Sequence, residues 1–128
     1  MPSNLITPHG SLPLPAFFPD ATRAVVRSVD AADLRTVGTT GIYVNALHLA
    51  HEPGLSVVDA VGGVHRFMGW DGPIISDSGG YQVYSLIERS KSYGGITDEG
   101  FTYRLKPGDK KTLQIGRASC RERVYVLV

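Results

Sequence analysis

Two short apolar runs separated by a helical segment constrain the fold of this chain most. The run IYVN at residues 42–45 and the run PIIS at residues 73–76 have the composition of buried strands. Residues 56–61 are predicted to form a helix between them, which the adjacent glycines Gly62 and Gly63 end. Strands that alternate with helices at this spacing are typical of a parallel sheet. We therefore expect an α/β fold, with an α/β barrel and a doubly wound sheet as the candidates.

The segments before residue 42 extend this alternation toward the N-terminus. Residues 5–18 are predicted to form a hairpin region around the turn PHG, and residues 16–23 to lead into a strand that ends in a polar loop. Asp30 is a candidate helix N-cap, and Asp33 falls in the first turn, where a carboxylate suits the helix dipole. Gly38 is expected to end that helix. The predicted order is strand, helix, strand, helix, strand.

Composition excludes some classes of protein. The chain has 128 residues, enough for one small domain, with 42% apolar and 20% charged residues and a formal net charge of +1. That charge does not by itself indicate a nucleic-acid or membrane surface. No apolar run approaches the roughly 20 residues of a membrane span, and the N-terminus does not have the pattern of a signal peptide. A cytoplasmic location is therefore expected.

The last fourteen residues differ in character from the rest. The string IGRASCRERV at residues 115–124 resembles the translation of a common sequencing adapter. We interpret residues 115–128 as an artefact of this kind; the alternative is a natural basic tail that ends in a short apolar strand. The single cysteine, Cys120, lies in this segment, so no internal disulfide is expected.

Polar residues follow each predicted strand. In parallel α/β folds the loops after the carboxyl ends of the strands carry the chemistry. The segments that contain Asp20, Asn45 and Asp77 all fall at such ends. Three polar loops on one rim suggest a functional site.

The motif DSGGYQ after the last of these strands has the composition of a ligand site. Asp77 would be partly desolvated, which makes it a candidate to accept or donate a proton. Gly79 and Gly80 lack Cβ atoms, so a planar ligand or a phosphate could approach the backbone closely. Tyr81 could stack on a flat ring, and Gln82 offers both a donor and an acceptor. The alternative is a tight turn in which the aspartate caps and the glycines supply positive φ.

Two other motifs favour structural roles. His48 and His51 have metal-ligand spacing on a helix, but Pro53 and Gly54 follow at once, so a helix through them is doubtful and a loop or structural role is expected. The basic and aromatic residues at 65–70 could touch nucleic acid, although a packed loop with a solvated arginine is more common.

Four consecutive motifs resemble one known family. They are NALHL at residues 45–49, GGVHRFMGWD at residues 62–71, PIISDSGGYQVYSL at residues 73–86 and ITDEGFTYR at residues 96–104. In this order and spacing they resemble the tRNA-guanine transglycosylases. The resemblance extends over about residues 6–113.

The resemblance implies a fold and a reaction. The fold is a TIM (β/α)8 barrel, of which residues 1–114 would be the N-terminal, truncated part. The reaction is tRNA base exchange, in which queuine or a deazaguanine precursor replaces guanine at the wobble position of the anticodon during queuosine biosynthesis. In that family an Asp nucleophile attacks the ribose, giving a covalent enzyme–RNA intermediate, and the full-length protein is a homodimer.

The resemblance also assigns roles to residues of this chain. Asp77 matches the second aspartate of the family, which handles the proton on the incoming or leaving base. Ser78, Gly79 and Gly80 match the loop that holds the base. Tyr81 matches the aromatic side chain that stacks on it.

Some positions depart from the family or fall short of it. Asn45 and Gln82 would help to line the base pocket, but Ala46 and Leu47 replace the Thr and Tyr that are common there. The nucleophilic Asp and the zinc site of three Cys and one His match no position up to Leu113. We therefore expect no metal ligands within this chain, no base-exchange activity from it, and poor folding at best.

Two other functions stay open on the sequence. One is a noncatalytic subunit or module of the same fold, which would hold tRNA or a base without exchanging it. The other is a TIM-barrel enzyme that acts on a different planar heterocycle.

Overall fold

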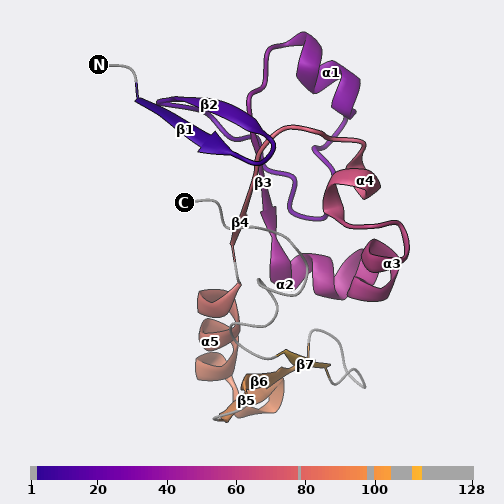
Figure 1. The fold of residues 1–128 in the computed structure, drawn as a ribbon. Coiled ribbons are helices and arrows are strands. Elements are labelled where there is room, and N and C mark those ends of the chain that lie inside the picture. The colour runs from indigo at the N-terminus through magenta and orange to yellow at the C-terminus, as the bar shows by residue number, and fades with distance from the viewer. Residues whose placement is uncertain (1–2, 78, 98–99, 105–110, 114–128) are drawn as a thin grey trace.

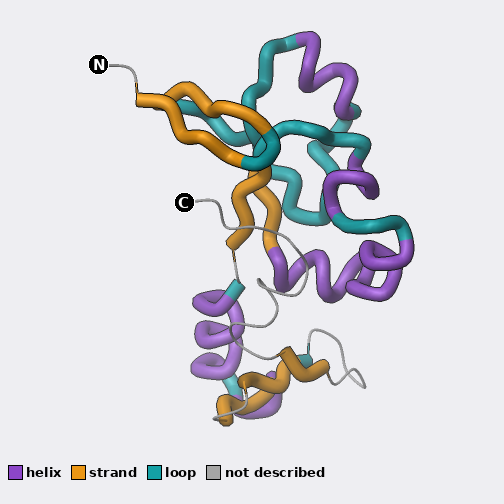
Figure 2. The backbone as a smooth tube through the Cα atoms, in the orientation of Figure 1, coloured by secondary structure: helices purple, strands orange, loops and turns teal. Residues whose placement is uncertain are grey.

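A computed structural model describes residues 3–77, 79–97, 100–104 and 111–113. Three small sheets organise this part of the chain: an N-terminal hairpin, a central parallel pair of strands and a three-stranded antiparallel sheet. The hairpin lies beside the beginning of the central pair, and most of the short helices lie on one side of that pair (Figure 1). Coloured by secondary structure, the connection between the two central strands is mostly helical, and further helices lie before and after it (Figure 2).

The predicted N-terminal hairpin is present, but it spans residues 3–14 rather than 5–18. Strand β1 (Ser3–Thr7) pairs antiparallel with β2 (Gly10–Leu14), and Thr7 is opposite Gly10. The Thr7 Oγ1 donates to the carbonyl of Gly10 at 2.7 Å, and Gly10 has a φ of 116°, which favours glycine. The Thr7 side chain and the positive φ of Gly10 therefore stabilise the turn between the two strands.

The predicted strand at residues 16–23 is wrong as a regular strand. Only Asp20 pairs, through an isolated parallel bridge to Tyr43 of the central sheet. The bridge rests on two backbone bonds, from Ala21 N to the Tyr43 carbonyl at 2.7 Å and from Tyr43 N to the Pro19 carbonyl at 3.0 Å. Ala24 then takes a φ of 59°, which turns the chain away from the extended conformation.

Helix α1 (Ala31–Thr36) begins as the sequence predicts. The Asp30 side chain accepts from Asp33 N at 2.8 Å, and the Asp33 side chain accepts from Asp30 N at 3.1 Å. This reciprocal pair is a capping box, and it satisfies donors that the first helical turn leaves unpaired. Gly38, with a φ of 76°, follows the end of the helix.

The central parallel pair matches the predicted strands to within one residue. Strand β3 (Ile42–Asn45) pairs with β4 (Ile74–Asp77), so that Ile42 is opposite Ile74 and Asn45 is opposite Asp77. The connection contains four helical segments, which are α2 (Ala46–Leu49), the π-helical η1 (Ala50–Gly54), α3 (Leu55–Ala60) and α4 (Val64–Met68). Strand, helical crossover and parallel strand form a βα unit, as the sequence predicts.

Three details of this crossover differ from the predictions. Helix α2 begins at Ala46, directly after β3, where a polar loop was expected. The helical segment continues through His51 and breaks only at Glu52, which has a φ of −150° and a ψ of 118°. Residues 65–70 were expected to be a packed loop, but they are mostly α4. The predicted stop after α3 is confirmed, because Gly63 N donates to the Val58 carbonyl at 2.9 Å.

The main hydrophobic core packs the crossover helices against the two strands. Its buried members come from residues 19–28, which we call the bridge segment, and from α1, β3, the crossover and β4. They are Ala21, Ala24, Leu34, Ile42, Val44, Leu49, Val58, Val64, Trp70 and Ile74. Ile42 and Val44 are fully buried in this core. Because side chains alternate along a strand, Tyr43 and Asn45 lie on the opposite face of β3.

A second core lies below the first in Figure 1 and joins the later elements to α2. These elements are α5 (Gly80–Arg89), the 3-10 helix η2 (Lys91–Tyr93) and the antiparallel strands β5 (Gly94–Thr97), β6 (Gly100–Tyr103) and β7 (Lys111–Leu113). Leu47 of α2, Val83 of α5 and Tyr103 of β6 are buried together.

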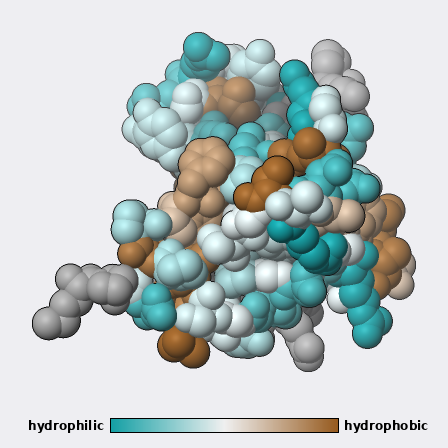
Figure 3. All heavy atoms as spheres, turned by 90° about the horizontal axis from the view of Figure 1, so that it is seen from above, coloured by the Kyte–Doolittle hydropathy of each residue, from teal (hydrophilic) through white to brown (hydrophobic). Residues whose placement is uncertain are grey.

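The described residues form an α/β fold, as expected, and they do not close a barrel. Viewed from above, hydrophobic side chains on the surface are separated by polar ones (Figure 3). No helix in the described part of the chain is both long and apolar enough to span a membrane. The interpretation of residues 115–128 as an artefact concerns a segment outside the described residues, and it stays a prediction.

Candidate functional site

The polar ends of the two central strands meet at one edge of the sheet. Asn45 is the last residue of β3 and Asp77 the last of β4, and the parallel register places them opposite each other. Asn45 is buried, and Asp77 is half-buried. The bridge between Asp20 and Tyr43 brings a third polar segment alongside the same strands. The sheet thus gathers the three segments that the sequence predicted to share a rim.

The Asp77 carboxylate is held by three donors, two from β3 and one from the turn before α5. Its Oδ2 accepts from the Tyr43 hydroxyl at 3.0 Å and from Asn45 Nδ2 at 3.4 Å, and its Oδ1 accepts from Gly79 N at 2.9 Å. An ionised carboxylate has about four acceptor positions. Among the described residues, these contacts leave about one position, on Oδ1, for a ligand that donates a hydrogen bond.

Asn45 links the carboxylate to the two flanking helices. Its Oδ1 accepts from His48 N at 3.2 Å, so it is the N-cap of α2. Its Nδ2 donates to Gln82 Oε1 of α5 at 3.0 Å and more weakly to Asp77. A single amide therefore orients the starts of both helices around Asp77.

Tyr43 faces the same carboxylate from the middle of β3. Burial is the main cause that raises the pKa of its phenol above the usual value, followed by the hydrogen bond to Asp77 and the charges of Asp77 and Asp20. The phenol therefore stays protonated at neutral pH and can act only as the donor in its bond to the Asp77 carboxylate.

Gly79 is required by the backbone and by packing. It has a φ of 71° and lies directly before α5. A Cβ atom at this position would overlap the Cβ of Leu47, so the turn packs tightly on α2. The turn expected from the sequence is therefore present, and Asp77 caps it through the bond from Gly79 N. The turn and the polar cluster around Asp77 are one structure.

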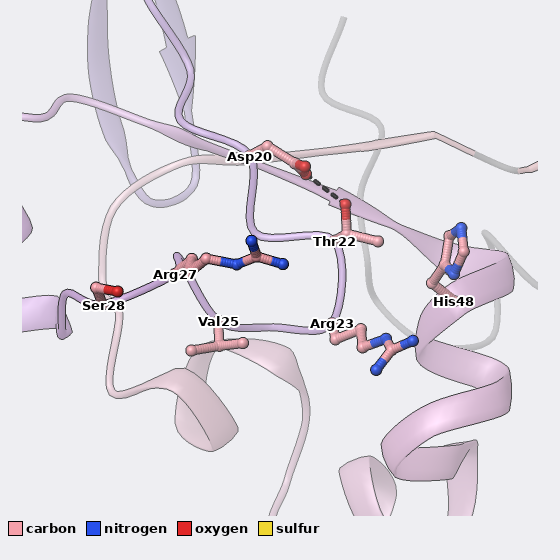
Figure 4. Close-up of a pocket in the computed structure, with 7 residues that line it drawn as sticks. All are labelled: Asp20, Thr22, Arg23, Val25, Arg27, Ser28 and His48. Atoms are coloured by element: carbon pink, nitrogen blue, oxygen red, sulfur yellow. Dashed lines mark hydrogen bonds between the residues drawn. The ribbon is translucent and has the colours of Figure 1, made fainter.

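A hollow of about 650 Å³ lies on the bridge segment next to His48. It is lined by Asp20, Thr22, Arg23, Val25, Arg27, Ser28 and His48. Figure 4 shows the Arg27 guanidinium pointing into this hollow, below the Asp20–Thr22 hydrogen bond. Arg23 at its edge pairs with Glu52 at 3.0 Å. Two guanidinium groups therefore lie beside the polar rim.

These features define the chemistry that the site can support. A half-buried carboxylate with an open acceptor position suits proton exchange with an N–H of a planar ligand. The hollow that Arg23 and Arg27 line suits an anionic group. The described residues contain no group of three or more His, Cys, Asp or Glu side chains that could hold a metal ion.

Comparison with known proteins identifies the family. The family model described as queuine tRNA-ribosyltransferase matches residues 3–118. The chain belongs to the queuine tRNA-ribosyltransferase family. The matched range includes the first four residues of the segment that we interpret as an artefact, so it leaves that interpretation a prediction.

Individual relatives of this queuine tRNA-ribosyltransferase family member agree. A queuine tRNA-ribosyltransferase of Lactococcus lactis subsp. cremoris is 45% identical over 100 residues, which are 78% of this chain and 25% of that protein. That of a Nostoc species is 43% identical over 110 residues, 86% of this chain and 28% of that protein. That of Streptococcus gordonii is 43% identical over 100 residues. The chain spans about a quarter of the length of these relatives.

The structure brings together only some of the residues that the resemblance assigns. Asp77, Gly79, Asn45 and Gln82 form one connected cluster. Gly80 is the first residue of α5. Ser78 lies outside the described residues.

Tyr81 lies apart from that cluster. Its side chain is 83% exposed, and it lines a shallow groove on α5 with Tyr84, Ser85, Glu88 and Arg89. The structure does not place this ring against the Asp77 carboxylate.

Sequence reasoning missed Tyr43. The signal was present, because a side chain two residues before Asn45 on a strand shares its face. Without the register between β3 and β4, however, the sequence did not indicate that this face meets Asp77.

Proposed function

We propose that this chain is the N-terminal part of a tRNA-guanine transglycosylase, which exchanges guanine at the anticodon wobble position for queuine or a deazaguanine precursor. Membership of the family supports the reaction class. The observation that carries the proposal is the Asp77 carboxylate, which is half-buried at the strand ends and oriented by three donors. The described residues leave it open to one more donor. A guanine ring offers N–H donors of the kind that such a carboxylate binds.

Asp77 is proposed to handle the proton of the exchanged base. The protonated carboxyl group gives a proton to a ring nitrogen of the leaving base, and the carboxylate so formed accepts one from a ring nitrogen of the incoming base. Asn45 and Gln82 would supply amide donors and acceptors to the base edge. Ser78, Gly79, Gly80 and Tyr81 keep their proposed role around the ring, with Tyr81 turned onto it from the start of α5.

The ribose-attacking aspartate and the zinc ligands are not assigned to residues of this chain. The described residues do not offer a donor set for zinc. No step of the proposed chemistry is therefore placed on a metal. The noncatalytic binding module remains the second candidate, because the polar cluster around Asp77 could hold a base without exchanging it.

A TIM barrel is the proposed fold of the complete protein. The bridge segment, β3 and β4 lie side by side, all parallel, in the order in which they occur along the chain. A barrel of this type begins with neighbouring parallel strands that are joined by helical crossovers. The functional rim at their carboxyl ends supports the same fold.

The proposed partner is tRNA. The guanidinium groups of Arg23 and Arg27, which line the hollow next to His48, suit the phosphates of an RNA backbone. We propose that the complete protein works as a homodimer in the cytoplasm, where its substrate is found. Analytical ultracentrifugation of the complete protein tests the dimer.

Incorporation of radiolabelled guanine into tRNA tests the function. We expect exchange by the complete protein, loss of at least roughly a hundredfold in Asp77→Asn, and wild-type rates in the control Asp59→Asn, an exposed carboxylate on α3. The 128-residue chain alone is expected to give no turnover. Full activity of Asp77→Asn would contradict the role of Asp77, and guanine binding without exchange by the complete protein would favour the binding module.

A further inference from the structure

We propose that Tyr43 is a positioning residue for Asp77, which holds that carboxylate in the orientation and charge state needed to accept a proton from the base. This inference rests on the proposed function of Asp77. It concerns a residue that none of the family-like motifs contains, since these begin at Asn45 on this strand.

The position of Tyr43 is fixed by its surroundings. It lies between Ile42 and Val44, both fully buried, so the backbone of β3 cannot shift without disturbing the core. The bridge segment also holds its backbone on one side, through bonds with Pro19 and Ala21. The hydroxyl is therefore presented to Asp77 Oδ2 by a rigid strand.

Tyr43 is the principal donor to that oxygen. Its bond to Oδ2 is 3.0 Å, whereas the second donor, Asn45 Nδ2, is 3.4 Å away and also donates to Gln82 at 3.0 Å. A hydrogen bond to an ionised group is stronger than one between neutral groups, and it weakens steeply with distance. Without Tyr43, the longer, shared amide bond of Asn45 would be the only one that the described residues still make to Oδ2.

Tyr43 also leaves the reactive position free. Its bond occupies Oδ2, while the position that the described residues leave open for a ligand is on Oδ1. Because burial and the neighbouring Asp77 and Asp20 carboxylates raise the pKa of its phenol, Tyr43 remains a donor throughout the neutral range. A donor that stays protonated favours the charged, proton-accepting form of the carboxylate.

The test is Tyr43→Phe in the complete protein, assayed by guanine exchange across pH. We expect kcat/KM to fall roughly tenfold or more, the size of a lost hydrogen bond to a charged group. We also expect the acid limb of the pH profile to move to higher pH, because the charged form loses a donor. In the described part of the chain, the titratable groups that face Asp77 and Tyr43 are each other and Asp20.

Tyr84→Phe is the matched control. It also removes a tyrosine hydroxyl bonded to a carboxylate, since Tyr84 lies 2.8 Å from Glu88 on the exposed face of α5. We expect its exchange rate and pH profile to equal those of the wild type. Thermal unfolding of both variants reports any loss of stability separately from the chemistry.

Three outcomes would overturn the inference or separate it from the proposed function. A Tyr43→Phe profile equal to that of Tyr84→Phe overturns it and leaves the proposed function intact if Asp77→Asn is inactive. A lower rate and a lower Tm with an unmoved acid limb reduces Tyr43 to a structural residue and also overturns it. Full activity of Asp77→Asn removes both proposals together.

Discussion

The imidazole rings of His9 and His65 lie face to face, with their centroids 3.8 Å apart and their planes 14° from parallel. His9 is in the turn of the β1–β2 hairpin, and His65 is on α4. The Nε2 of His65 lies 3.0 Å from the Gly72 carbonyl. The stack therefore ties the N-terminal hairpin to the crossover that leads into β4.

This stack makes stability depend on pH. Burial is the main cause that lowers the pKa of His65 below its usual 6.5, with the proximity of His9 second. A folded-state pKa below the unfolded one means that the unfolded chain binds protons first as pH falls. The contribution of His65 is thus complete above about pH 6.5 and is lost as pH falls below it.

We expect the Tm to fall between about pH 8 and about pH 5, more steeply in the wild type than in His9→Phe, which keeps a stacking ring without a second charge. Circular dichroism melting curves at each pH measure the effect. Equal slopes for the two proteins would show that the His9 charge has no part in it.

The capping box of α1 gives a second expectation. Asp30→Ala removes the acceptor for Asp33 N and should lower the free energy of unfolding by about 1 kcal/mol. Asp59→Ala is the control, because Asp59 lies near the C-terminal end of α3, where a carboxylate does not cap a helix start. Urea unfolding compares the two variants. An equal cost for both would contradict the assignment of Asp30 as a cap.

The ion pair between Arg35 and Asp71 gives a third testable prediction. Arg35 Nε and Nη2 both donate to Asp71 Oδ1, at 3.1 and 3.0 Å, and this bond is the main cause that lowers the pKa of the Asp71 carboxyl. In Arg35→Gln we expect that pKa to return toward its usual value, as carboxyl carbon NMR would measure. Because the pair is exposed, little change in stability should accompany the shift. An unmoved titration would contradict the assigned cause.

The parts that were predicted from sequence are those with local signals. Residues 42–45 read as a strand because β-branched residues and burial select an extended chain, and Asp30 read as a cap because its partner is three residues away. Segments stabilised by distant contacts were assigned wrongly. Residues 65–70 were expected to be a loop, but most of them form helix α4. This short helix is held by the burial of Val64 and of the neighbouring Trp70, which a local sequence pattern does not reveal.

The site follows the same division. The sequence placed Asp77 at a strand end, but its contact with Tyr43 joins residues 34 positions apart and depends on how β3 and β4 align. A shift of one residue in that register would turn Tyr43 to the other face. Only one of the two reasons for glycine at position 79 could be predicted from the sequence. The sequence suggested positive φ, whereas the contact with Leu47 requires the position of α2.

Gly79 therefore supports the last expectation. Gly79→Ala should lower the free energy of unfolding by more than Gly38→Ala does. The two glycines have similar φ values, 71° and 76°, but a Cβ on Gly38 would meet no atom within 4 Å, while one on Gly79 would overlap Leu47. The backbone strain of about 1 kcal/mol is common to both, and the overlap should add about 1–3 kcal/mol.

Urea unfolding of the two variants measures that difference. The overlap should also displace Gly79 N from Asp77 Oδ1 and so disturb the carboxylate. Leu47→Ala does not relieve the overlap, because alanine keeps the Cβ atom, whereas Leu47→Gly removes it. We therefore expect Leu47→Gly, but not Leu47→Ala, to lower the added cost of Gly79→Ala in a double-mutant cycle. Additive costs in both cycles would mean that the contact between Gly79 and Leu47 does not decide the requirement for glycine.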